Sequence, residues 1–220
     1  MRKSLKICNR KRVIIIEVLD IALPQNLENM SLPSPELVNY YRLAENRIFY
    51  IDYEIDESVL EVQKAIIYYN IIDKDIPVSE RKPIIILLDT PGGLLVETFS
   101  LAQTMVMSKT KVITVNIGTA YSGGALLLLA GHEKYTLKYS KAMIHSGSTS
   151  GGGGTFEQNE AAQKIYKQQI DDMAEFILER STIDSKVFKR NKAKDWYFSS
   201  EEQVKYGLAD KIITSLDEII

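Results

Sequence analysis

The chain has 220 residues, 45% of them hydrophobic and 25% charged, and its formal net charge is −2 at pH 7. These values are ordinary for a globular protein, so they allow one domain with a sizeable core and argue against wholesale disorder. The balanced charge offers no basic surface for nucleic acid, and no apolar run is long enough to span a membrane. The single cysteine, Cys8, excludes an intramolecular disulfide and a cysteine-based metal site. We expect a cytoplasmic protein without a metal or a cofactor.

Residues 1–39 lack a regular pattern, and we predict that they form an N-terminal extension ahead of a single domain over residues 40–220. Hydrophobic periodicity and turn residues predict the elements of that domain. The predicted strands, in chain order, are 47–51, 84–88, 112–117, 135–139 and 142–144. The predicted helices are 58–72, with Ser58 as its N-cap, then 95–107, 123–130 and 156–179. This alternation of strands and helices is typical of an α/β fold.

A Gly/Ser/Thr-rich run over residues 146–155 contains four consecutive glycines and separates the last predicted strand from the long helix. Such runs are usually linkers. Because this run directly follows His145, an active-site loop is an equally good interpretation of it.

A serine stands at a predicted corner between a strand and a helix. The segment Gly118-Thr-Ala-Tyr-Ser-Gly-Gly-Ala125 ends a buried strand and opens an apolar helix. The Ser122 hydroxyl therefore lies beside backbone N–H groups of the first helical turn, which have no partner within the helix and are able to receive an oxyanion. The alternative is that Ser122 only caps the helix, and this segment alone favours that alternative.

A second corner has the sequence Asp89-Thr-Pro-Gly-Gly93 and also ends an apolar strand ahead of a helix. Glycines allow the backbone to approach a ligand closely and to present N–H donors. Two such corners at the same end of adjacent strands would face one crevice, where α/β sheets usually bind ligands. Neither corner matches a P-loop or a dinucleotide-binding fingerprint.

The candidates for a general base near neutral pH are two histidines, His132 and His145. His132 follows the apolar helix at the end remote from Ser122, so we predict a structural role for it. His145 closes the strand 142–144, and beside a corner serine it would be the natural proton acceptor.

A third group must orient the histidine, and the chain offers 29 acidic residues. Asp171 and Asp172 fit the solvated face of the long helix. Asp195 precedes an aromatic, strand-like segment, which predicts a partly buried position and makes it a modest favourite.

Taken in order, these segments resemble the proteolytic subunit of the Clp protease. That family has S-P-G-G after a strand, a G-x-x-S-M-G-A corner, a strand ending in M-I-H, a glycine-containing loop before a long helix, and a tail with Y-G-L-x-D-x-I. This chain has Thr90-Pro-Gly-Gly93, Gly118–Ala125, Met143-Ile-His145 and Tyr206-Gly-Leu-Ala-Asp-Lys-Ile212. The order and approximate spacing agree from about Tyr40 to Ile213.

The resemblance implies a crotonase-like ββα spiral with a long helix and a glycine-rich handle. It implies a serine endopeptidase with Ser122 as nucleophile, His145 as base and Asp195 as the orienting acid. The implied oxyanion donors are the backbone N–H groups of Gly93 and Gly123.

The resemblance also implies that Gly92, Ser146 and Gly147 contact the substrate and that the glycine-rich run lines the substrate groove. Its implied substrates are polypeptides. The implied assembly is a homo-oligomer of heptameric rings, which can stack into a tetradecamer around a chamber, and the family allows an AAA+ unfoldase as a partner. No nucleic acid and no membrane is expected as a partner.

The chain departs from the family pattern at four places, one of which is Ala193-Lys194, where many members have a charged pair next to the aspartate. Tyr121-Ser-Gly-Gly124 replaces A-S-M-G, His145-Ser-Gly147 replaces H-Q-P, and Ile85-Ile-Leu-Leu-Asp89 replaces Y-L-Y-I-N, whose tyrosines help to form the docking cleft for an unfoldase. Three other interpretations stay open: an acyl-CoA hydratase or isomerase on the same fold, a ring subunit with a degenerate site, and a serine–lysine peptidase with Lys164 or Lys167 as base.

Overall fold

The computed structural model of the chain describes residues 35–147 and 153–220. Residues 1–34 and 148–152 lie outside the described part, so most of the predicted N-terminal extension and half of the glycine-rich run are not tested by it. The boundary between the extension and the domain at residue 40 stays a prediction. The first described element is a helix absent from the predicted set, α1 (Pro35–Glu45).

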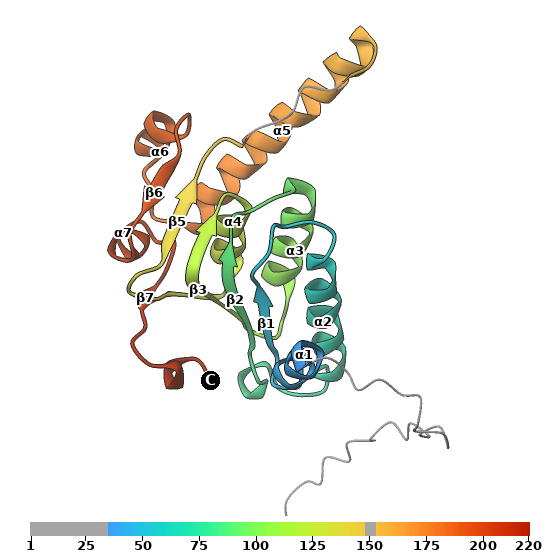
Figure 1. The fold of residues 1–220 in the computed structure, drawn as a ribbon, viewed down its shortest axis with the longest axis vertical. Coiled ribbons are helices and arrows are strands. Elements are labelled where there is room, and N and C mark those ends of the chain that lie inside the picture. Colours follow the sequence, from blue (N-terminus) through green and yellow to red (C-terminus); the bar gives the residue numbers. More distant parts are fainter. Residues whose placement is uncertain (1–34, 148–152) are drawn as a thin grey trace, which may run out of the picture.

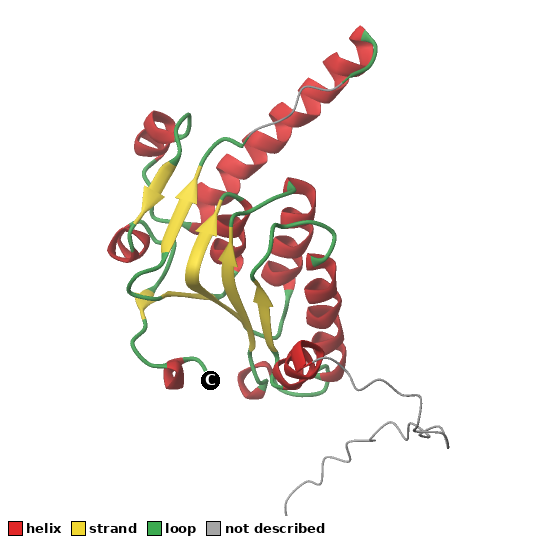
Figure 2. Cartoon of the chain, in the orientation of Figure 1, coloured by secondary structure: helices red, strands yellow, loops and turns green. Residues whose placement is uncertain are grey.

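The centre of the molecule is a seven-stranded sheet whose main path runs β1-β2-β3-β4-β7 (Figures 1 and 2). Neighbours along this path are parallel, and β5 is also parallel to β3, whereas β6 is antiparallel to β5. The strands are β1 (Ile48–Ile51), β2 (Ile84–Thr90), β3 (Val112–Tyr121), β4 (Glu133–Thr136), β5 (Lys141–Ile144), β6 (Trp196–Phe198) and β7 (Lys211–Ile212). The predicted α/β class is therefore confirmed.

Apolar side chains lie on both faces of the sheet, as parallel strands require. Alternate residues of β2 point to opposite faces of the sheet. Ile84, Ile86 and Leu88 belong to the larger hydrophobic cluster, on one face, and Ile85 and Leu87 belong to the smaller cluster, on the other. Residues of α2, α3, α4 and α5 cover the larger face, and a partly buried leucine of α1 and the C-terminal segment cover the smaller one. The helices are α2 (Val59–Ile72), α3 (Leu95–Met107), α4 (Gly123–Ala130), α5 (Phe156–Arg180), α6 (Ser185–Asn191) and α7 (Ser200–Lys205), with short 3-10 turns at η2 (Val78–Glu80) and η3 (Leu216–Glu218).

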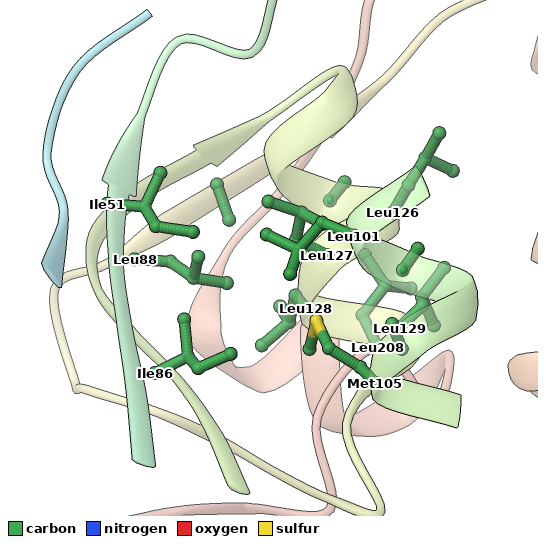
Figure 3. Packing of buried hydrophobic residues seen from close by; sticks show 14 of the residues in the cluster. Ile51, Ile86, Leu88, Leu101, Met105, Leu126, Leu127, Leu128, Leu129 and Leu208 are labelled. Carbon is green, nitrogen blue, oxygen red and sulfur yellow. The ribbon is translucent and has the colours of Figure 1, made fainter. Parts of the chain in front are cut away.

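Helix α4 lies at the centre of the core (Figure 3). All eight of its residues are buried, and Leu126–Leu129 pack among side chains of β2 and α3. A helix that is apolar on every side is stable only when it is enclosed on every side. The residue just before α4, Ser122, is therefore anchored to a fully buried helix.

Most predicted elements are confirmed, and the helices at 95–107 and 123–130 have the predicted bounds. Strand β3 is longer than predicted, because its second half, beyond Ile117, pairs with β5. The strand predicted at 135–139 lies earlier, over β4, because the chain turns where the N–H of Ser140 donates to the carbonyl of Leu137. Ser58 does precede α2, but its side chain makes no capping hydrogen bond.

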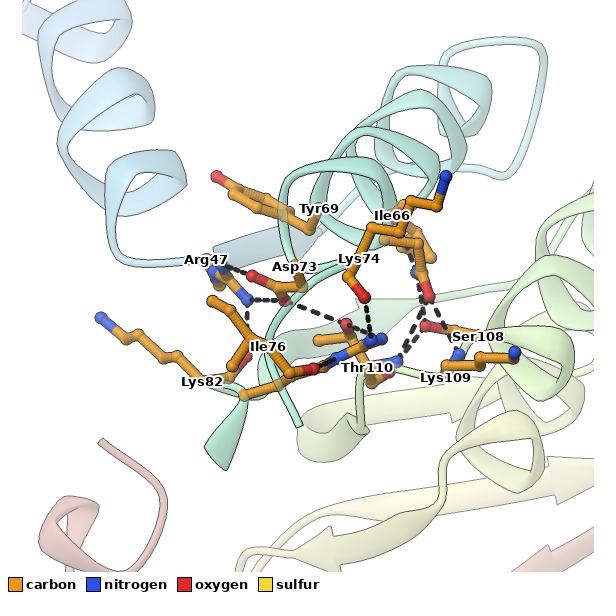
Figure 4. Close-up of polar contacts among 12 residues, drawn as sticks. Arg47, Ile66, Tyr69, Asp73, Lys74, Ile76, Lys82, Ser108, Lys109 and Thr110 are labelled. Carbon is orange, nitrogen blue, oxygen red and sulfur yellow. Dashed lines mark hydrogen bonds and ion pairs between the residues drawn. The ribbon is translucent and has the colours of Figure 1, made fainter. Parts of the chain in front are cut away.

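A buried ion pair fixes the entry to β1 (Figure 4). The Arg47 guanidinium donates to both carboxylate oxygens of Asp73, at 2.6 and 2.7 Å, and to the carbonyl of Lys82 at 2.7 Å. Thr110 donates to the same carboxylate, and the guanidinium lies over the ring of Tyr69. These contacts tie the start of β1 to the C-terminal end of α2.

The N-terminal part of α5 extends away from the rest of the molecule (Figure 1). Thr155 begins this helix with a capping box, in which its side chain and that of Gln158 satisfy each other's backbone N–H groups. Phe156 and Ile165 are exposed on the extended part. Among residues 35–147 and 153–220, no helix is both long enough and apolar enough to cross a lipid bilayer.

Candidate active site

Three neighbouring strands bring the predicted triad residues to one edge of the sheet. Ser122 directly follows β3, His145 directly follows β5, and Asp195 directly precedes β6. The C-terminal ends of parallel strands meet at the same edge, together with the N-terminal end of an antiparallel neighbour. The order β3-β5-β6 therefore places the three side chains side by side, with the histidine in the middle.

Ser122 has a backbone conformation that few residues other than glycine adopt, with φ 52° and ψ −115°. Its N–H donates to the carbonyl of Met143 at 2.8 Å, and its own carbonyl accepts from the N–H groups of Ala125 and Leu126. These bonds hold a conformation that typically costs about 1–3 kcal/mol. The side chain makes no capping hydrogen bond, so the alternative in which Ser122 only caps the helix is wrong.

His145 contacts both neighbours, but not equally. Its Nε2 lies 2.8 Å from Ser122 Oγ, which is a hydrogen-bond distance. Its Nδ1 lies 3.4 Å from Asp195 Oδ1, and no hydrogen bond joins these two described groups. The Asp195 side chain is 56% exposed, so it is less buried than the sequence predicts. Water therefore weakens the attraction between this carboxylate and the imidazole.

The two glycine corners adjoin each other at Ser122. Gly92 and Gly93 both have positive φ, 94° and 155°. A Cβ atom on Gly92 would lie 2.8 Å from Ser122 Cβ and 2.9 Å from the backbone nitrogen of Gly123, so no other residue fits there. Among the described residues, the N–H groups of Gly93 and Gly123 donate to no other group. Both are thus available to an oxyanion beside the serine.

A cleft of about 510 Å³ opens at this edge. Its lining includes the apolar residues Met143 from β5 and Ile170 and Met173 from α5. The residues that line the cleft are Glu54, Pro91, Gly93, Leu94, Leu95, Val96, Glu97, Ser122, Met143, His145, Gly147, Tyr166, Gln169, Ile170 and Met173.

The three residues predicted to contact substrate have different positions. Gly147 lines the cleft. Ser146 instead donates through its hydroxyl to the carbonyl of Lys192. Gly92 is buried against the Ser122 corner and does not line the cleft. The part of the glycine-rich run at 148–152 lies outside the described residues.

The remaining candidate residues have structural or solvated positions. His132 accepts a hydrogen bond at Nδ1 from the N–H of Val112, and burial lowers the pKa of its imidazole, as expected for a structural histidine. Asp171 and Asp172 are exposed on α5, as predicted. In the described part of the chain, no group of three or more His, Cys, Asp or Glu side chains is arranged to hold a metal ion.

The candidate lysines of the serine–lysine interpretation, Lys164 and Lys167, are exposed on α5 and do not line the cleft. The sequence motifs did not predict the carboxylates of Glu54 and Glu97, which do line the cleft. Glu97 follows the second glycine corner closely, and that proximity was a usable signal. Glu54 reaches the cleft only through tertiary pairing, for which the local sequence holds no signal.

Comparison with known proteins agrees with this architecture. The model of the family described as Clp protease matches residues 36–216. The chain is 29% identical over 186 residues to the ATP-dependent Clp protease proteolytic subunit 3 of Synechococcus sp. (strain CC9605), covering 81% of this chain and 88% of that protein. It is 30% identical over 185 residues to subunit 2 of Prochlorococcus marinus (strain MIT 9312), covering 81% and 87%. The chain therefore belongs to the Clp protease family, and its α/β architecture is that family's crotonase-like fold.

Proposed function

We propose that this protein is a serine endopeptidase that hydrolyses peptide bonds with Ser122 as nucleophile, His145 as general base and Asp195 as the acid that orients the histidine. Its relatives are named as protease subunits, which supports peptidase chemistry at this site. The observation that carries the proposal is the 2.8 Å separation between Ser122 Oγ and His145 Nε2 at the mouth of a cleft. A nucleophile within hydrogen-bond reach of its base is the geometric signature of covalent acyl transfer.

The proposed reaction has two halves. Ser122 Oγ attacks the substrate carbonyl while His145 Nε2 accepts the hydroxyl proton, and the N–H groups of Gly93 and Gly123 stabilise the tetrahedral oxyanion. The imidazolium then protonates the leaving amine, which leaves an acyl-enzyme. Water attacks this ester with His145 again as base, and the released acid regenerates Ser122.

A fluorophosphonate probe tests this proposal directly, because it phosphonylates only a serine that has been activated as a nucleophile. We expect one labelled peptide, and mapping by mass spectrometry should place the label on Ser122. His145→Ala should reduce the labelling rate to the background level, whereas Lys164→Ala and Lys167→Ala should not change it. An unlabelled wild-type protein with a native circular dichroism spectrum would refute the proposal and favour a hydratase, an isomerase or a degenerate ring subunit.

Asp195→Asn should have a smaller effect than loss of the nucleophile or the base. The carboxylate is exposed and lies 3.4 Å from the imidazole, so it contributes mainly orientation and the correct tautomer. We expect kcat/KM for a fluorogenic peptide to fall by about 10²–10⁴-fold, against a larger loss for Ser122→Ala. An unchanged pH profile and unchanged kcat/KM in Asp195→Asn would show that another group orients His145.

We also propose that the domain over residues 40–220 assembles as a homo-oligomer of heptameric rings, stacked in pairs as a tetradecamer, in the cytoplasm, with an AAA+ unfoldase as partner. The support is the family together with unpartnered apolar surface on this chain. Ile67 and Ile71 are exposed in the C-terminal half of α2, Met107 at the end of α3, and Phe156 on the extended part of α5. Such surfaces usually mark contacts between proteins.

A further inference from the structure

Two carboxylates line the candidate cleft beside Ser122. Glu54 is exposed and Glu97 is half-buried. Among the described residues neither side chain forms an ion pair or a hydrogen bond, so both are available to a ligand. No lysine or arginine is among the described residues that line the cleft, and residues 148–152, which follow Gly147 in the sequence, include no charged residue.

Backbone pairing holds Glu54 next to the proposed oxyanion donor. The following residue, Ile55, forms a parallel bridge with Gly93. The Ile55 N–H donates to the carbonyl of Gly92 at 2.7 Å, and the Ile55 carbonyl accepts from the N–H of Leu94 at 2.8 Å. The backbone of Glu54 is therefore held at the cleft, because the next residue is hydrogen-bonded to the segment that contains Gly92 and Gly93.

Further negative charge lies on the other side of Glu54. A second groove, of about 810 Å³, shares this residue and is also lined by Asp52 and Asp56, without any lysine or arginine among its described lining. Burial, followed by the charges of Asp56 and Asp52, raises the pKa of Tyr53 to about 12. Glu61 in the same groove is neutralised by Lys64 and adds little. The described charges that line the two grooves around Glu54 are thus mainly negative.

A structural role explains Glu97 in part but does not explain Glu54. Glu97 lies in the first turn of α3, where a carboxylate stabilises a helix through its dipole. Glu54 lies outside every helix and strand, and the described residues offer it no partner. A role in ligand binding explains why both carboxylates line the cleft.

We propose that Glu54, assisted by Glu97, makes the cleft prefer polypeptides with a lysine or arginine side chain close to the scissile bond, an inference that rests on the proposed peptidase function. The aliphatic part of such a side chain would pack on apolar residues of the lining such as Met143, Ile170 and Met173. Its charged end would reach the carboxylates. Because ion pairs near water are individually weak, we expect a preference of roughly five- to tenfold.

The first experiment measures binding to the Ser122→Ala protein, so that it does not depend on catalysis. Fluorescence anisotropy compares N-acetylated peptides that differ only in carrying lysine or uncharged norleucine at one position, scanned along the sequence. Acetylation removes the terminal amine, which is another source of the same charge. We expect roughly five- to tenfold tighter binding of the lysine peptide at one or more positions in 50 mM salt, falling below about twofold in 500 mM salt.

The second experiment measures kcat/KM of the wild-type protein for the same peptides as internally quenched substrates. The lysine-to-norleucine ratio should fall to about one in the Glu54→Gln/Glu97→Gln variant. Glu57→Gln removes one carboxylate charge, half the change made in the double variant, from an exposed residue that does not line the cleft, and it should leave the ratio unchanged. Circular dichroism should show the same fold for all variants.

The outcomes separate this inference from the proposed function. Equal binding of both peptides, or a ratio that survives the double Gln substitution, would overturn the preference even if every peptide were cleaved at Ser122. A loss of the ratio in Glu57→Gln would show a general charge effect and would overturn it as well. If no peptide is cleaved but lysine-dependent binding is lost in the double variant, the cleft binds basic polypeptides and the proposed hydrolysis is wrong.

Discussion

Replacing Ser122 by alanine should lower the rate of cleavage of a small fluorogenic peptide by about 10⁴–10⁶-fold. The hydroxyl at this position is 2.8 Å from the proposed base, and the described residues that line the cleft include no second serine. His145→Ala should cost a similar factor. Because the two groups act as a unit, the double variant should lose no more activity than either single variant. Initial rates at substrate concentrations well below KM measure all three.

A matched control for this prediction is Ser58→Ala, which removes the hydroxyl of an exposed serine that makes no capping bond. It should keep wild-type activity. Circular dichroism and size-exclusion chromatography should show that Ser122→Ala folds and assembles normally. Substantial cleavage by folded Ser122→Ala would disprove the assignment, and retained activity in His145→Ala would point to a different base.

Replacing Asp73 by alanine should reduce the free energy of unfolding by about 3–5 kcal/mol. The Asp73 side chain is 1% exposed and faces the Arg47 guanidinium at 2.6 Å, so its removal leaves a buried cation without a counter-charge. That loss is a large fraction of the roughly 5–15 kcal/mol by which domains are usually stable. Urea unfolding followed by circular dichroism measures it.

The control for this prediction is Glu61→Ala, which breaks the exposed ion pair with Lys64 and should cost under about 0.5 kcal/mol. The double variant Arg47→Ala/Asp73→Ala should lose less stability than the sum of the single variants, because it leaves no unpaired charge. Additive losses would show that the pair is not coupled.

The same ion pair predicts how stability changes with pH. The hydrogen bond from Arg47, with a further one from Thr110, holds the pKa of the Asp73 carboxyl below its usual value. A carboxyl with a depressed folded-state pKa stabilises the fold above its unfolded-state pKa, and the stabilisation is lost as the pH falls through the folded-state value. Acid titration of the wild type and of Asp73→Ala should therefore converge in stability at low pH.

Local signals predicted the elements that lie deepest in the core. Pro83 and the glycine corner delimit β2, and Ser122 and Gly131 delimit α4, so these ends can be read from neighbouring residues alone. The second half of β3 could not be predicted in this way, since Gly118 and Thr119 look like turn residues until β5 pairs with them. Pairing with β5 therefore outweighs the low strand propensity of this segment.

In the candidate site, too, residues in local motifs could be predicted from the sequence, whereas features that depend on tertiary structure could not. Two corner motifs and a strand-ending histidine were visible in the sequence, and the sheet order brings them together. The exposure of Asp195 was not visible, because it depends on how β6 lies against β5 at the edge of the sheet. Glu54 was not visible either, because only the bridge between Ile55 and Gly93 carries it to the cleft.

The positive φ of Ser122 has a consequence for how this protein can evolve. Glycine adopts such a backbone without steric penalty, so a glycine at position 122 would relax the corner and favour the folded chain. Selection for stability alone would therefore replace Ser122 by glycine. Only selection for the hydroxyl group would retain serine at this position. In lineages that dispense with the chemistry, we expect position 122 to be among the first to drift.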